Sequence, residues 1–215
     1  DGFNDYHLVR LICLALSGLV IRSERAVRAI LIRHCETASN RDGRTQGLSD
    51  GELDSTGLRQ AEALATSLKS EQLSAIYSSP LKRALATARA IAELHNLTVE
   101  KDDDLRELNQ GDLDGLTFQE LRVKHAESLQ DLQARAYACL ERIMKKHPEG
   151  TVAVVSHNFT ILTILCRVIG LDLSKFRRLG LSVAAKNIVE FRDSGPVLVL
   201  LNDTHHLTGV PKEAS

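Results

Sequence analysis

The chain has 215 residues, of which 43% are hydrophobic and 26% are charged, and its formal net charge at pH 7 is −1. This length suits one well-buried domain, and the composition is that of an ordinary globular protein. Because no general basic field exists, we expect no nucleic-acid partner, and any affinity for phosphate must be local.

The cysteines indicate the compartment in which the chain works. Cys13, Cys35, Cys139 and Cys166 are scattered, and no two of them form a C-x-x-C pair. This spacing argues against a structural zinc site and against a disulfide framework, and it fits a reducing compartment. We therefore expect a cytoplasmic protein with no bound metal.

Residues 1–26 differ from the rest of the chain. Residues 11–21 carry no charge, but they are fewer than the about 20 residues that cross a bilayer. We predict an amphipathic helix that packs on the body or on a partner, with a membrane-facing role as the alternative. We treat residues 1–26 as an extension and residues 27–215 as one domain, and a homodimer stays open. The apolar positions on one helical face are Leu8, Leu11, Ile12, Ala15 and Leu19.

The first predicted strand of the domain ends in two polar residues. Residues 29–32 form an apolar run typical of a buried strand, and Arg33 and His34 follow it directly. In an open α/β sheet, ligands bind beyond the carboxyl ends of the strands. An arginine and a histidine at that place suit an anion that is both held and attacked. The alternative is a solvated pair at a strand end.

A polar loop and a second strand–helix unit come next. Residues 40–53 contain three glycines and read as a loop, after which Asp54 offers an N-cap to a helix that continues to residue 68. Residues 75–78 predict a second strand, and Pro80 suits the first turn of the following helix. Because a helix N-terminus favours anions, Arg83 is expected to reach the same pocket as Arg33.

The rest of the sequence predicts a third strand, two helices, a central strand with its helix, and a closing hairpin. Residues 152–155 are all apolar, as in a central parallel strand, and His157 and Asn158 stand at its carboxyl end. This arrangement repeats that of Arg33 and His34. The other predicted elements are a strand at 98–100, helices at 118–124, 129–144 and 159–169, and hairpin strands at 184–192 and 197–202.

These motifs resemble those of the histidine phosphatase (phosphoglycerate mutase-like) superfamily. Residues 33–37 match its Arg-His-Gly-Glu/Ser-Thr signature, except that Cys35 replaces the glycine. Residues 78–88 match its Ser-Ser-Pro-Leu-Lys-Arg-Ala-x-x-Thr-Ala motif, and residues 107–115 resemble its third motif, with Leu113 in place of the usual aromatic residue. Relatives usually carry a longer lid after residue 124, so either this lid is short or a segment is absent from the chain.

The resemblance implies a three-layer α/β/α sandwich with a mostly parallel central sheet. It implies metal-independent hydrolysis of a small phosphorylated metabolite through a phosphohistidine, without a cofactor. His34 would be the nucleophile and Glu107 the proton shuttle, although Glu107 could instead pair with the arginines. The phosphoryl group would be held by Arg33, Arg83 and His157, the last either as a cation or as a neutral N–H donor. The other substrate-binding positions are Asn40, for which turn formation is the alternative, and Gln46, Gly47 and Asn158.

Two functional alternatives and one hypothesis about Cys35 accompany this interpretation. The chain could be a cofactor-dependent phosphoglycerate mutase, or a catalytically idle phosphate-binding regulatory module. The short lid and the absence of the mutase-type Tyr-Gly-x-Leu-x-Gly pattern favour a phosphatase. We also hypothesise that the thiol of Cys35, next to Arg33 and His34, has a lowered pKa that makes the site redox-sensitive, with a buried inert thiol as the alternative.

Overall fold

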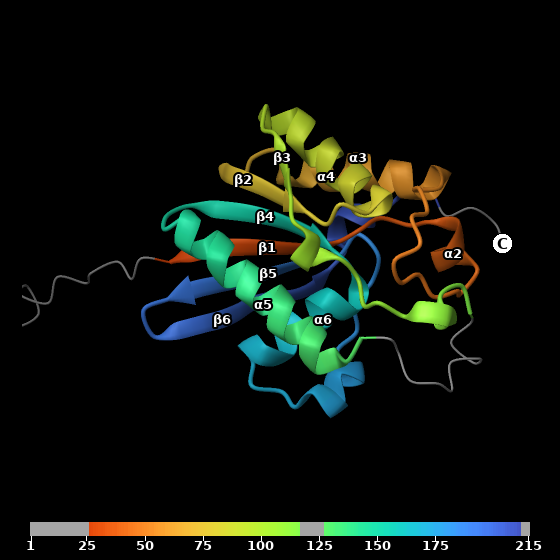
Figure 1. The fold of residues 1–215 in the computed structure, drawn as a ribbon. Coiled ribbons are helices and arrows are strands. Elements are labelled where there is room, and N and C mark those ends of the chain that lie inside the picture. The colour runs from red at the N-terminus through yellow and green to blue at the C-terminus, as the bar shows by residue number, and fades with distance from the viewer. Residues whose placement is uncertain (1–25, 117–126, 212–215) are drawn as a thin grey trace, which may run out of the picture.

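The computed structural model describes residues 26–116 and 127–211 (Figure 1). The predicted N-terminal helix, the helix at 118–124 and most of the proposed lid lie outside these residues. Within the described residues, no helix is long and apolar enough to cross a membrane. The strands are β1 (Val27–Arg33), β2 (Leu73–Ser78), β3 (Val99–Lys101), β4 (Thr151–Ser156), β5 (Lys186–Arg192) and β6 (Gly195–Asp203). The α-helices are α2 (Ala38–Arg41), α3 (Ser55–Leu68), α4 (Lys82–His95), α5 (Leu129–Lys146) and α6 (Asn158–Val168).

The strands form one six-stranded sheet in the order β3-β2-β4-β1-β5-β6. The four strands from β3 to β1 are parallel to one another, whereas β5 and β6 are antiparallel to their neighbours. Every residue of β4 is buried, as its all-apolar run predicts for a central strand. The mostly parallel sheet and the closing hairpin are therefore confirmed.

Helices cover both faces of the sheet, which gives the expected three layers (Figure 1). Successive side chains of a strand point to opposite faces, so Ile30 and Ile32 pack on the side of α3 and α4. Ala29 and Leu31 pack on the other side, in the cluster that includes residues of α5 and α6. The two apolar clusters hold the carboxyl ends of β1 and β4 between rigid layers.

Two local details differ from the sequence predictions. Pro80 stands before α4 and not in its first turn, because Leu81 is extended, with a φ of −65° and a ψ of 137°, and serves as the N-cap. The side chain of Ser79 accepts a hydrogen bond from the Leu81 amide and so stabilises this extended entry. The loop predicted at 40–53 begins inside the one-turn helix α2, which Thr37 and Asn40 close with a reciprocal capping box.

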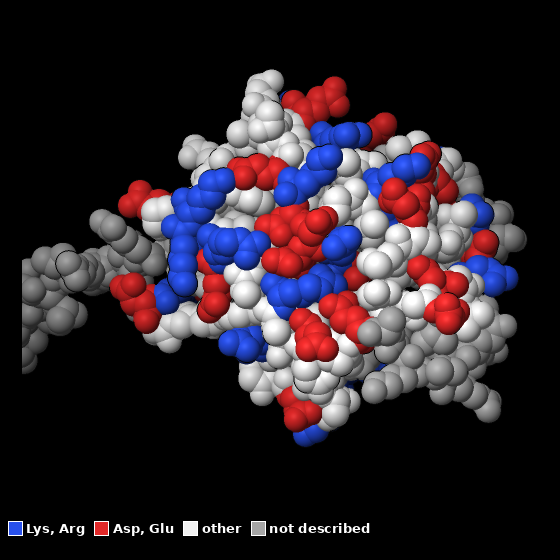
Figure 2. Space-filling model, viewed as in Figure 1, with Lys and Arg blue, Asp and Glu red and all other residues white. Residues whose placement is uncertain are grey.

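The surface charges agree with the sequence composition. On the face shown in Figure 2, basic and acidic side chains are interspersed, and no broad basic area covers it. This face therefore carries no broad positive field that would attract a phosphate group.

Candidate active site

The two strand ends that carry the predicted histidines lie side by side. β1 and β4 are neighbours in the sheet, with Arg33 paired to Ser156, so His34 and His157 leave the sheet at the same edge. Their rings are 5.2 Å apart between centroids and both are buried. The repeated pattern of an apolar strand followed by a polar pair thus predicted their proximity.

A small cavity of about 40 Å³ lies at this edge. It is much smaller than the roughly 300 Å³ or more of a typical ligand pocket, so it suits one small group of a ligand. Of the predicted site residues, Arg33, His34, Asn40, Gln46, Glu107 and Asn158 line it. The sequence interpretation missed four further lining residues, which are Arg44, Thr45, Gln110 and Phe159.

His34 is held as a neutral ring with a defined tautomer. Its Nδ1 lies 2.8 Å from the carbonyl oxygen of Cys35, which can only accept, so Nδ1 carries the proton and donates it. Burial lowers the pKa of His34 well below its ordinary value, and the positive charges of Arg83 and Arg33 lower it further. The lone pair therefore resides on Nε2, the nitrogen that can attack an electrophile.

The two predicted arginines have different positions. Arg33 lines the cavity and donates a hydrogen bond to the Leu181 carbonyl at 2.6 Å. Burial lowers the pKa of Arg33 to about 10, which leaves it charged at neutral pH. Arg83 is fully buried, does not line the cavity, and donates to the carbonyls of Ser49 and Gly47 at 2.6 and 2.9 Å. Gly47 thus contacts Arg83 and is not part of the cavity lining.

Glu107 is a buried carboxyl group at the N-terminus of α6. It accepts hydrogen bonds from the amides of Leu108, Phe159 and Thr160 and from the Thr160 hydroxyl. Burial raises its pKa, and this effect outweighs the opposing hydrogen bonds and the charges of Arg83 and Arg33. A carboxyl group with a raised pKa is suited to donate a proton near neutral pH.

His157 occupies the N-cap position of α6 but forms no cap with its side chain, a role that Glu107 takes over. Its Nε2 lies 2.7 Å from the hydroxyl of Ser79, and its buried Nδ1 has no hydrogen-bond partner among the described residues. Burial and the charge of Arg83 lower its pKa well below the ordinary value. The structure thus favours the neutral N–H donor over the imidazolium.

Asn40 and Gln46 both contact Thr37. The side-chain oxygen Oδ1 of Asn40 accepts from the Thr37 amide at 3.2 Å, and the side-chain oxygen Oε1 of Gln46 accepts from the Thr37 hydroxyl at 2.8 Å. Asn40 therefore has the turn-forming role given as its alternative, while still lining the cavity.

The hypothesis of a reactive Cys35 is wrong. Its side chain is buried in the apolar cluster with Ile30 and Ile32, and burial raises the pKa of the thiol to about 12. Proximity in sequence to Arg33 and His34 does not place the thiol beside their charges, so the alternative of an inert buried thiol describes it.

The residues that the sequence interpretation missed stand next to predicted ones. Arg44 and Thr45 precede Gln46 in the polar loop, Gln110 lies in the third motif, and Phe159 follows Asn158. Thr160, which contacts Glu107, stands three residues after His157, the spacing that joins an N-cap to the first turn of its helix. Within the described residues, no three His, Cys, Asp or Glu side chains come together as metal ligands.

Comparison with known proteins agrees with this geometry. The profile of the histidine phosphatase superfamily (branch 1) matches residues 29–204. Phosphoserine phosphatase 1 of Hydrogenobacter thermophilus is 37% identical over 199 residues, which cover 84% of this chain and 94% of that protein. A probable phosphoglycerate mutase of Yersinia pestis is 32% identical over 204 residues, covering 84% of this chain and 95% of that protein.

Solved structures give the same result. A mutant phosphoserine phosphatase of Entamoeba histolytica, crystallised with phosphoserine, superposes with a TM-score of 0.79 at 29% identity, covering 84% of this chain and 99% of that chain. A mycobacterial glucosyl-3-phosphoglycerate phosphatase superposes with a TM-score of 0.76 at 26% identity, covering 84% of this chain and all of that one. The chain therefore belongs to the histidine phosphatase superfamily and is a phosphatase that hydrolyses small phosphomonoesters through a phosphohistidine.

Proposed function

We propose that the phosphohistidine forms on Nε2 of His34. The observation that carries this proposal is the hydrogen bond from Nδ1 to the Cys35 carbonyl, which fixes the tautomer and leaves the lone pair on Nε2 of a ring that lines the cavity. Attack of Nε2 on phosphorus forms the N–P bond and breaks the bond from phosphorus to the ester oxygen. Water then attacks the phosphohistidine and releases inorganic phosphate.

Arg33, Arg83 and His157 stabilise the charge of the phosphoryl oxygens. Arg33 lines the cavity as a partly buried cation, and Arg83 adds a second positive charge that acts on His34. His157 does not line the cavity, but its ring packs against that of His34, and its Nδ1 has no hydrogen-bond partner in the described part of the chain. Preorganised charges in a buried site stabilise a transition state far more than the same charges in water. Gln46 and Asn158 line the same cavity and bind the phosphoryl oxygens, with Asn40 and Gly47 shaping the loop around them.

Glu107 transfers the protons. Its raised pKa lets it protonate the leaving ester oxygen, after which the carboxylate takes a proton from the attacking water. Both steps need the carboxyl group at one fixed place beside the cavity, where it is buried and accepts four hydrogen bonds from protein groups.

The substrate is a small phosphorylated acid of the phosphoserine or phosphoglycerate type. The small cavity accommodates the phosphoryl group, and the rest of the ester lies outside it. This class is supported by the phosphoserine phosphatases among the relatives and by the Entamoeba enzyme, of which one structure holds 3-phosphoglyceric acid. The 32% identity to a probable phosphoglycerate mutase makes mutase activity the second candidate.

Residues 27–215 form the catalytic domain, since the family match begins at residue 29 and the sheet at Val27.

A cytoplasmic location is supported by Cys35, Cys139 and Cys166, which are free and buried thiols.

Measuring both products separates the two candidates. Purified protein is given phosphoserine, and in parallel 3-phosphoglycerate with and without 2,3-bisphosphoglycerate. We expect release of inorganic phosphate that does not require the bisphosphate and that His34→Ala abolishes. Efficient formation of 2-phosphoglycerate with negligible phosphate release would show a mutase instead.

A further inference from the structure

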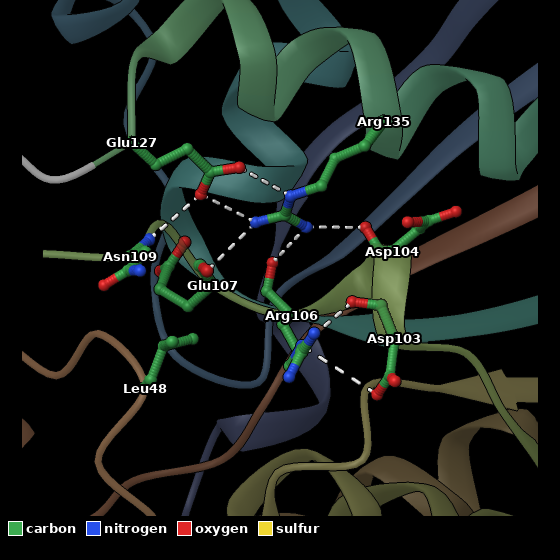
Figure 3. Close-up of a pocket in the computed structure, with 8 residues that line it drawn as sticks. All are labelled: Leu48, Asp103, Asp104, Arg106, Glu107, Asn109, Glu127 and Arg135. Carbon is green, nitrogen blue, oxygen red and sulfur yellow. Dashed lines mark hydrogen bonds and ion pairs between the residues drawn. The ribbon is translucent and has the colours of Figure 1, made fainter.

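The segment that carries Glu107 lies outside the strands and the α-helices. It runs from Asp104 to Asn109, beginning inside the 3₁₀ turn Asp103–Leu105 and ending before the turn Gly111–Leu113, so no sheet ladder fixes its backbone. Its outer side borders a cavity of about 280 Å³ instead of packed core (Figure 3). Something other than close packing must therefore hold the segment on that side.

Arg135 of α5 donates to three backbone carbonyls of this segment. One terminal nitrogen donates to the carbonyls of Asp104 and Arg106 at 2.7 and 2.9 Å, and the other donates to the carbonyl of Glu107 itself at 3.1 Å (Figure 3). A guanidinium group has five N–H donors in a rigid planar fork. Three of these five donors are used on the backbone beside Glu107.

Glu127 uses the other two donors and holds the far end of the segment. Its carboxylate accepts from Nε and a terminal nitrogen of Arg135 at 2.7 and 3.0 Å, a bidentate geometry that fixes the guanidinium plane. The same carboxylate accepts the amide of Asn109 at 3.0 Å, and the Glu127 amide donates to the Asn109 carbonyl at 3.1 Å.

We propose that Arg135, held by Glu127, is a positioning residue that fixes the backbone on both sides of Glu107 and so keeps its carboxyl group at the leaving oxygen. This inference rests on the proposed function of Glu107 as the proton shuttle. Arg135 does not line the cavity that contains His34, so it acts through the segment and not on the substrate's phosphoryl group. Displacement of a catalytic group by about 1 Å can cost about 10²-fold in rate.

The choice of leaving group separates positioning from a merely structural role. p-Nitrophenol leaves without protonation, whereas the serine oxygen of phosphoserine needs a proton from Glu107. We measure the single-turnover release of each leaving group with wild type, Glu107→Gln and Arg135→Lys. Lysine keeps the positive charge but lacks the planar fork, so it cannot bind three carbonyls and a carboxylate together.

We expect Arg135→Lys to slow the phosphoserine reaction by about 10²-fold and the p-nitrophenyl phosphate reaction only slightly. In the Glu107→Gln background, Arg135→Lys should not slow the hydrolysis of phosphoserine any further, because both changes act on the same step. Equal losses for the two esters would overturn the inference. Since both esters are assayed on the same sample, partial unfolding cancels in the ratio of their rates.

Arg142→Met is the matched control. Arg142 lies on the same helix and bonds the side chains of Asp102 and Asp104, but in an exposed position and without contacting the Glu107 backbone. Its loss should leave the ratio of the two rates unchanged, and a change as large as that of Arg135→Lys would contradict the proposal.

The Glu107→Gln variant shows which of the two proposals fails. If Glu107→Gln itself slows both esters equally, the proton-shuttle role fails. If Glu107→Gln is selective and Arg135→Lys is not, only the positioning role fails.

Discussion

At the scale of single residues, the site sets two buried histidines beside the buried Arg83 and the partly buried Arg33. Burial and the neighbouring positive charges both disfavour the imidazolium form, so the pKa of His34 and that of His157 are lowered well below 6.5. A neutral ring is the form a nucleophile needs, and the same electrostatics make the ligand-free protein sensitive to acid.

The stability of the ligand-free protein should fall as the pH drops below about 6.5. In that range the histidines of the unfolded chain bind protons while His34 and His157 of the native protein do not, which favours unfolding. Each such histidine contributes a slope of up to about 1.4 kcal/mol per pH unit. The raised pKa of Glu107 acts in the opposite direction, because the native carboxyl group holds its proton to higher pH than the unfolded one.

Urea unfolding of wild type and His34→Gln between pH 7.5 and 5 measures this slope. Below about pH 6, the variant should lose up to about 1.4 kcal/mol per pH unit less than wild type, since the contribution of His34 is removed while those of other histidines with lowered pKa values remain. Parallel curves for the two proteins would mean that His34 is charged in the native state.

Much of the site could be predicted at this scale, but not all of it. Arg33, His34 and His157 were predictable because each stands at the carboxyl end of an apolar strand, Arg33 as the last residue of β1 and the histidines directly after β1 and β4. Cys35 was not, because its sequence neighbours do not reveal that its side chain turns into the core. Arg135 was missed because its role depends on backbone carbonyls 28 to 31 residues away, which carry no sequence signal.

At the scale of elements, Asp114 joins the third motif to the loop that holds Arg83. Its carboxylate accepts the amides of Gly47 and Ser49 at 2.8 and 2.9 Å and the Ser49 hydroxyl at 3.0 Å. The carbonyls of the same two loop residues bind Arg83. The Asp114 carboxylate thus helps to orient the guanidinium of Arg83 through the backbone of Gly47 and Ser49.

Asp114→Ala should therefore impair phosphate binding. Loss of these hydrogen bonds should lower the free energy of unfolding by about 1–3 kcal/mol. The looser loop should raise KM for phosphoserine by about 10-fold, equivalent to 1.4 kcal/mol, with a smaller effect on kcat. Steady-state kinetics and urea unfolding measure the two effects. Asp112→Ala, which removes an exposed carboxylate from the same turn, is the control. A similar rise in KM in both variants would contradict the role given to Asp114.

At the scale of the whole molecule, the sequence pattern predicted the layers better than the connections between them. The apolar runs indicated a buried strand at β1 and a central strand at β4, and the periodicity of α3 indicated a helix. The entry into α4 differed because Ser79 stabilises an extended Leu81, a local hydrogen bond that competes with the preference of Pro80 for a first helical turn.

The central claim is that one fixed tautomer of His34 carries the phosphoryl group, and direct trapping of this intermediate tests it. Wild-type protein is mixed with radiolabelled p-nitrophenyl phosphate, quenched within the first turnover, digested at alkaline pH and mapped by mass spectrometry. We predict an acid-labile, alkali-stable phosphate on His34 that is absent from His34→Ala, with Arg135 and Glu107 variants still labelled by this ester. Label on His157 or on another residue, or full turnover by His34→Ala, would contradict the account.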